Sequence, residues 1–265
     1  MRSTRHVELT AAGRVLLEEG TLALAALERA VDRTRLAGTD TDGTIRLCYT
    51  PIASFGTLGA ILTAVQTDNR NLTVIQRERY SATIPARLLA GEDDIGLVLY
   101  SEPTKGVASE ILRVEPLAAL LSEHHHLADT EAIPLAKLQD ETLLIFSREH
   151  APTYYDHIIS TCERAGFQPR VNAFRDPRPL AMLARMATGH EVGLTPASFA
   201  FHAADAQPGV VARKIVDPEI LAEWSIVWPM AAESAAIARF LDSARKYAAD
   251  NNWPSWPKPE PPPGY

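Results

Sequence analysis

Hydroxyl side chains follow several apolar segments that have the composition of β-strands. These are Thr50, Ser81, Thr83, Ser101, Ser147 and Thr195. In an open α/β sheet, ligands bind beyond the carboxyl ends of the strands, where the next helix begins with free N–H groups. A hydroxyl at such a position can help to hold a carboxylate, although each one taken singly is better explained as an ordinary helix N-cap. Together they favour a cleft that binds a small anionic or aromatic acid.

The segments that carry these hydroxyls contribute further candidate ligand-binding residues. These are Pro51, Ala82, Tyr100, Phe146, Arg148 and Pro196. Arg148 can form a two-pronged ion pair with a carboxylate. Tyr154 and Tyr155 open a predicted helix nearby. Because adjacent residues of a helix point in different directions, only one of these two tyrosines can face the cleft.

The sequence shows no pattern that predicts catalysis or metal binding. His124, His125 and His126 are consecutive, and we expect their side chains to diverge in a surface turn rather than to share an ion. Cys48 and Cys162 each lie in an apolar segment, which predicts buried free thiols in a reducing compartment. We find no nucleophile–base–acid spacing and no phosphate loop. We therefore expect neither enzymatic activity nor a cofactor or metal.

Strand and helix patterns alternate from residue 44 onward, which predicts parallel sheets with helical crossovers. The predicted strands are 44–49, 72–78, 95–99, 143–146, 170–174, 191–195 and 226–228, and the predicted helices are 55–67, 81–90, 153–165, 179–188 and 233–249. Segment 111–121, broken by Pro116, would cross to a second lobe, and segment 210–216 would return. This order predicts an α/β fold of two lobes with a cleft between them.

We place lobe I at residues 43–117 and 216–249 and lobe II at residues 118–215. Residues 10–38 have the composition of one long helix, with Thr10 as its expected N-cap. Its apolar stripe, in part a seven-residue repeat, predicts a coiled-coil seam between two chains, the alternative being packing on its own domain. The residues of the stripe are Leu17, Leu24, Leu27 and Val31. The proline-rich residues 250–265 are expected to lack regular structure.

The net charge of −7 argues that most of this chain does not touch nucleic acid, because a protein that grips DNA usually carries a basic face. The exception is the first 14 residues, which contain Arg2, Arg5, Arg14 and His6 and the single acid Glu8. Such a basic patch is expected of a remaining DNA-binding edge, although many solvated N-termini look the same. No apolar run approaches the roughly 20 residues that span a bilayer, and no secretory signal pattern follows Met1. We therefore expect a cytoplasmic protein without a membrane partner.

Five segments, in order and spacing, resemble LysR-type transcriptional regulators. Residues 5–17 (RHVELTAAGRVLL) are similar to the end of the family's DNA-binding wing and the start of its linker helix. Residues 43–47 (GTIRL) resemble the start of its effector domain, and residues 88–97 (LLAGEDDIGL) resemble its turn into the third strand. Residues 123–127 resemble the turn after the first crossing, with His126 where proline is usual, and residues 191–196 (EVGLTP) resemble a turn of the second lobe.

The resemblance implies a periplasmic-binding-protein-like fold of type 2 with an N-terminal linker helix. It implies a homodimer or homotetramer that senses a small-molecule effector and controls transcription, and it supports Thr50, Ser81, Thr83, Ser147 and Thr195 as effector contacts. Residues 1–9, with Arg2 and Arg5, would be a remnant of the wing. We expect DNA to be contacted only through a recognition helix that this chain lacks.

Two other functions use a similar architecture. A solute-binding protein of the periplasmic type shares the two lobes, but it needs an export signal and has no use for a linker helix. An enzyme could use the hydroxyl-rich cleft, but it would need a reactive constellation that the sequence does not show. For the regulator, we expect ligand binding to close the lobes and to shift the N-terminal helices.

Overall fold

The computed structural model describes residues 10–13, 15–17, 19–20, 43–176, 178–232 and 234–253. Lobe I begins with β1 (Thr44–Tyr49), η1 (Pro51–Ser54), α2 (Thr57–Asp68), β2 (Thr73–Glu78), η2 (Ser81–Thr83), α3 (Ile84–Leu89) and β3 (Ile95–Leu99). Strand β1 pairs in parallel with both β2 and β3. Every residue of β3 is buried, as is typical of a strand that helices cover on both faces of a sheet.

Lobe II repeats the alternation of strands and helices. Its elements are β5 (Ala132–Pro134), η3 (Leu135–Leu138), β6 (Thr142–Phe146), α4 (Pro152–Arg164), β7 (Arg170–Phe174), α5 (Pro179–Thr188), β8 (Glu191–Pro196), α6 (Ala197–Ala206) and β9 (Val210–Val216). Strand β6 pairs in parallel with β7 and β8. The carboxyl ends of β6 and β8 therefore lie at one edge, where the sequence places Ser147 and Thr195.

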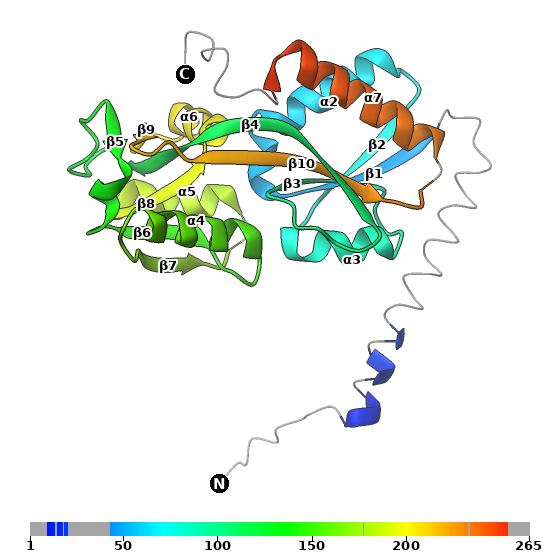
Figure 1. Ribbon diagram of the computed structural model, residues 1–265, viewed down its shortest axis with the longest axis horizontal. Helices are drawn as coiled ribbons and strands as arrows, with labels where there is room; N and C mark the ends of the chain where they lie inside the picture. The colour runs from blue at the N-terminus through cyan, green and yellow to red at the C-terminus, as the bar shows by residue number, and fades with distance from the viewer. Residues whose placement is uncertain are drawn as a thin grey trace.

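Two long antiparallel strands connect the lobes. These are β4 (Val107–Ser122) and β10 (Leu221–Pro229), which lie side by side across the middle of the molecule (Figure 1). The order of strands is β2-β1-β3-β10-β4-β8-β6-β7; off this path, β9 pairs with β4, and β5 pairs with β9. The closing helix α7 (Ala235–Asp250) packs against α2 of lobe I (Figure 1). The predicted two-lobed α/β architecture is therefore present.

The crossings differ from the sequence prediction. Segment 210–216 forms the predicted strand, but as β9 it pairs with β4 and β5 inside lobe II, so its prediction as the return crossing is wrong. The return is β10, which is far longer than the predicted strand 226–228. Pro116 does not break β4 either. It stands where the partner of β4 changes from β10 to β8, a position where a missing N–H is tolerated.

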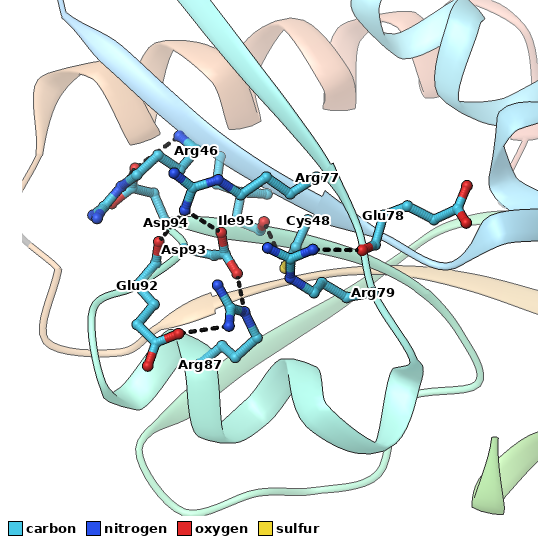
Figure 2. A network of polar contacts seen from close by, with 10 residues as sticks. All are labelled: Arg46, Cys48, Arg77, Glu78, Arg79, Arg87, Glu92, Asp93, Asp94 and Ile95. Carbon is cyan, nitrogen blue, oxygen red and sulfur yellow. Dashed lines mark hydrogen bonds and ion pairs between the residues drawn. The ribbon is translucent and has the colours of Figure 1, made fainter. Parts of the chain in front are cut away.

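A network of charged residues fixes the turn between α3 and β3 (Figure 2). Asp93 is fully buried and accepts hydrogen bonds from Arg77 (3.3 Å) and Arg87 (2.6 Å). Asp94 accepts from the backbone N–H of Arg46 at 2.8 Å and from its guanidinium at 2.6 and 2.9 Å. These bonds join β1, β2 and α3 to the turn, so they hold the first three strands of lobe I in register.

At the N-terminus, residues 11–13, 15–17 and 19–20 are helical, and the hydroxyl of Thr10 accepts a hydrogen bond from the Gly13 N–H at 3.0 Å, as expected of an N-cap. Leu17 has 59% of its surface exposed. The other residues predicted for the seam and the wing lie outside the described residues: Leu24, Leu27, Val31, Arg2 and Arg5. None of the described helices has the length and apolar character needed to cross a membrane.

Candidate functional site

A cavity of about 40 Å³ lies between the two lobes, and residues of both form its walls. They are Thr50, Pro51, Ile52, Tyr80, Ser81, Leu99, Phe146, His150, Ala151 and Tyr154. The Thr50 N–H donates to the Leu97 carbonyl at 3.1 Å, which extends the pairing of β1 with β3 by one residue. Thr50 thus stands at the carboxyl end of its strand, where ligands of open α/β sheets bind.

Three of the predicted hydroxyls are buried without a protein partner. Thr50, Ser147 and Thr195 are 7%, 6% and 0% exposed, and none of their hydroxyl oxygens has a hydrogen-bond partner among the described residues. Thr50 lines the cavity, Ser147 directly follows the lining residue Phe146, and Thr195 follows Leu194, whose carbonyl accepts the hydroxyl of the lining residue Tyr154. Buried hydroxyls are normally bonded, so this group of three is a candidate ligand-binding set.

Four of the residues predicted for the cleft line the cavity, namely Thr50, Pro51, Ser81 and Phe146. Arg148 does not. Its side chain is 65% exposed and forms a bidentate ion pair with Asp156, in which Nε and Nη2 donate to the carboxylate at 2.7 and 2.8 Å. That pair raises the pKa of Arg148 and lowers the pKa of Asp156. The guanidinium predicted to bind a carboxylate is therefore already occupied on the surface.

The remaining predicted residues lie beside the cavity. The N–H of Ala82 donates to the His150 carbonyl at 3.3 Å, and the hydroxyl of exposed Thr83 turns back to the Tyr80 carbonyl at 2.9 Å. Ser101 is half-buried, and Pro196 is buried at the start of α6. None of these four residues, nor Tyr100, is among the cavity-lining residues.

Tyr100 contacts lobe II instead. Its ring stacks on His157 of α4 with centroids 4.2 Å apart, and its hydroxyl donates to the Leu221 carbonyl at 2.8 Å. Burial raises the pKa of Tyr100 well above its ordinary value. Burial also lowers the pKa of His157, with Arg164 adding to the effect. Tyr100 and His157 therefore form an aromatic contact between the lobes.

Sequence reasoning missed two aromatic residues of the cavity. Tyr80 immediately precedes Ser81, and His150 lies three residues after Ser147, so both are in turns that already held candidate residues. Their rings stack with centroids 3.9 Å apart and planes 2° apart. Of the pair Tyr154 and Tyr155, Tyr154 faces the cavity and is 3% exposed. The signal that could have found Tyr80 and His150 was their position next to strand ends.

The histidine run departs from the sequence expectation. The rings of His125 and His126 do not diverge but stack 4.5 Å apart, and their Nε2 atoms lie 3.3 and 3.2 Å from the Glu141 carboxylate. The side chains of His125, His126 and Glu141 lie close enough together to be candidate metal ligands. However, Nδ1 of His125 accepts the Leu127 N–H at 3.2 Å, which leaves the proton on Nε2. This arrangement fits a hydrogen bond to Glu141 better than a metal ligand, which needs an unprotonated Nε2.

Cys48 and Cys162 are buried free thiols, as predicted. Burial, the largest cause, and the charge of Asp93, the second, raise the pKa of Cys48 to about 12. Burial, followed by the charge of Glu163, raises the pKa of Cys162 to about 11. Since the thiolate is the reactive form, both groups are poor nucleophiles.

A larger cavity of about 330 Å³ lies at the end of α2, lined by residues 67–72 and Arg239. It contains none of the residues predicted for the ligand cleft and no parallel-strand carboxyl end. The interlobe cavity is therefore the better candidate, because it combines the predicted hydroxyls with walls from both lobes.

The LysR substrate binding domain matches residues 38–249 of the chain. The regulator TfdS of Cupriavidus pinatubonensis is 28% identical over 249 residues, which cover 92% of this chain and 82% of TfdS. The regulator XapR of Escherichia coli is 28% identical over 243 residues, which cover 91% of this chain and 80% of XapR.

Solved structures show the same architecture. The LysR family regulator CbnR aligns with a TM-score of 0.75 and 25% identity, over 91% of this chain and 82% of CbnR. The BenM effector binding domain, solved with its effector benzoate, aligns with a TM-score of 0.70 and 22% identity, over 84% of this chain and 97% of that domain. On the match to residues 38–249 and on these relatives, the chain belongs to the LysR family of transcriptional regulators and contains its effector-binding domain.

Proposed function

We propose that this chain binds a small carboxylate or aromatic acid in the interlobe cavity and uses the binding to control transcription. The observation that carries the proposal is the set of three buried, unpartnered hydroxyls of Thr50, Ser147 and Thr195. A buried polar group without a partner costs about 1–3 kcal/mol. A ligand with several oxygen atoms would supply those partners and remove that cost.

The walls of the cavity support an acid with an apolar body. Phe146, Tyr154 and Leu99 present carbon surface, whereas Thr50 presents an unpartnered hydroxyl at the end of β1. This combination of an apolar lining with a few polar groups is typical of small-molecule sites. BenM, whose effector domain has the same fold, was solved with benzoate, which is an acid of this class.

We infer a binding role rather than catalysis. The relatives TfdS and XapR are transcriptional regulators, and a solute-binding protein of the periplasmic type is not favoured by these matches. Both thiols of the described region are held protonated by burial. The phenol of Tyr154, which lines the cavity, has a raised pKa because of burial, and its hydroxyl donates a hydrogen bond to a carbonyl.

For the output, we propose that residues 10–38 pair two chains as a helical seam, giving a dimer or a tetramer. Ligand binding between the lobes would change how the lobes, and hence the paired helices, are oriented. DNA would be contacted through a winged helix-turn-helix joined to those helices. The segment with Arg2 and Arg5, which resembles the end of the wing, supports this connection.

The test is calorimetric titration of the chain with benzoate and with a panel of aliphatic and aromatic carboxylic acids. We expect Thr50→Ala to weaken binding of the best acid by about tenfold or more, because a hydrogen bond to a charged group is lost. Thr50→Ser should keep most of the affinity. Thr63→Ala is the matched control, since Thr63 is exposed and its hydroxyl donates to the Gly59 carbonyl of its own helix at 2.8 Å.

Equal affinity of the wild-type protein and Thr50→Ala would remove Thr50 from the site. Failure of every acid in the panel to bind would overturn the ligand class.

A further inference from the structure

The two lobes are joined at the cavity by one compact set of contacts around His150. The ring of Tyr80, which follows β2 of lobe I, stacks on the ring of His150, which follows β6 of lobe II, at 3.9 Å and 2°. The His150 carbonyl also accepts hydrogen bonds from the Ser81 hydroxyl at 3.2 Å and from the Ala82 N–H at 3.3 Å. Three consecutive residues of lobe I therefore hold a single residue of lobe II.

The volume of the cavity can be compared with the volume that an aromatic ligand needs. With the stack in place, the cavity measures about 40 Å³. A cavity that accepts benzene measures about 150 Å³. Tyr80, Ser81 and His150 are themselves part of its wall. An acid of benzoate size therefore needs more room than the cavity offers, and the contacts of Tyr80 and Ser81 with His150 join the two lobes within its wall.

We propose that Tyr80 and His150 form a latch that holds the cleft narrow, and that an aromatic acid enters the cavity by opening it. The inference rests on the proposed function, because it takes this cavity as the effector site. It reverses the expectation from the sequence, in which the ligand closes the lobes. The latch lowers the apparent affinity of the ligand, because only the fraction of molecules with an open latch is competent to bind.

The backbone N–H groups of Ala82 and Thr83 give a direct readout of the latch. The Ala82 N–H donates across the cleft to His150, whereas the neighbouring Thr83 N–H donates to the Tyr80 carbonyl within lobe I at 3.0 Å. Opening of the latch breaks the hydrogen bond of the Ala82 N–H and exposes it to water, whereas the hydrogen bond of the Thr83 N–H stays intact. The ratio of their hydrogen-exchange rates, measured by NMR on the full chain, reports the opening and corrects for general loosening of the segment.

In the absence of added acid, we expect Tyr80→Ala to raise the exchange rate of Ala82 relative to Thr83 by about two- to tenfold, the range that an aromatic pair contributes. Tyr80→Phe keeps the ring and should match the wild-type protein. Equal ratios in wild-type protein and Tyr80→Ala would show that the stack does not hold the lobes together, and this result does not depend on any ligand.

In the wild-type protein, we expect saturating benzoate also to raise the ratio of the Ala82 exchange rate to the Thr83 exchange rate. A lower ratio would mean that the ligand tightens the contact, and it would overturn the latch as an entry gate. Calorimetry on the same samples separates the two proposals. If benzoate binds neither to the wild-type protein nor to Tyr80→Ala, benzoate is not the effector. If benzoate binds but leaves the ratio of exchange rates unchanged or lower, the result contradicts the latch and not the proposed function.

Discussion

The indole N–H of Trp224 donates to the buried carboxylate of Glu115 at 2.6 Å. Trp224 belongs to β10 and Glu115 to β4, so this bond joins the two strands that connect the lobes. The same carboxylate accepts from the N–H and the hydroxyl of Ser198, at 2.7 and 2.8 Å, at the start of α6. A negative charge at a helix N-terminus is favourable. Glu115 therefore ties both crossing strands to lobe II.

Replacing Trp224 by Phe is expected to lower the free energy of unfolding by about 1–3 kcal/mol, because Glu115 loses a donor in a buried site and the smaller ring leaves space. Urea unfolding followed by circular dichroism measures the change. Trp228→Phe is the control, because the Trp228 ring is half-buried and contacts the Arg245 guanidinium at the surface. Equal effects of the two substitutions would contradict a special role for the Glu115 bond.

Asp93 is expected to contribute more to stability than its neighbour Glu92. Asp93→Ala should lower the free energy of unfolding by about 3 kcal/mol or more, since it leaves the guanidinium groups of Arg77 and Arg87 without their buried partner. Glu92→Ala removes a more exposed carboxylate that pairs with Arg87 at 2.6 Å and should cost less than about 1 kcal/mol. Urea unfolding of both variants checks the difference. Similar losses would show that burial of Asp93 adds nothing.

His157 is expected to make stability fall with decreasing pH. Its pKa in the folded chain is lowered, by burial first and by Arg164 second, from an unfolded value of about 6.5. Below about pH 6.5 the unfolded chain therefore binds more protons than the folded chain, and the free energy of unfolding decreases as the pH falls towards and through the folded pKa. At higher pH, where both states are neutral, this effect is absent.

His157→Phe keeps an aromatic ring against Tyr100 but cannot take up a proton. Urea unfolding at several pH values between about 7.5 and 5 should show a smaller loss of stability in the variant than in the wild-type protein. All other titrating groups are common to both proteins, so the difference isolates His157. Parallel curves would show that His157 does not contribute.

The apolar stripe of residues 10–38 predicts self-association. We expect the chain to sediment as a dimer or a larger oligomer at micromolar concentration, and the double substitution of Leu24 and Val31 by Glu to shift it towards the monomer. Substitution of the exposed Glu19 by Gln, on the same segment, is the control. A wild-type monomer at this concentration would contradict the predicted seam.

The sequence by itself determined the alternation of strands and helices, because hydrophobic patterning and turn residues act over a few neighbouring positions. Segments 170–174, 179–188 and 210–216 form elements with the predicted bounds. The same local signals located the strand ends and hence Thr50, Ser81 and Phe146 at the cavity. The burial of Cys48 and Cys162 also followed from their apolar neighbours.

Only the tertiary structure decided which strand returns between the lobes and which side chains meet across the cleft. The partners of β9 and β10 depend on pairing between distant segments, which local patterning does not encode. The surface pair of Arg148 with Asp156, the stack of Tyr80 on His150 and the two histidines at Glu141 likewise depend on side-chain directions. Those directions are set by packing between elements, because a rotamer is chosen by the neighbours it contacts and not by the residue type alone.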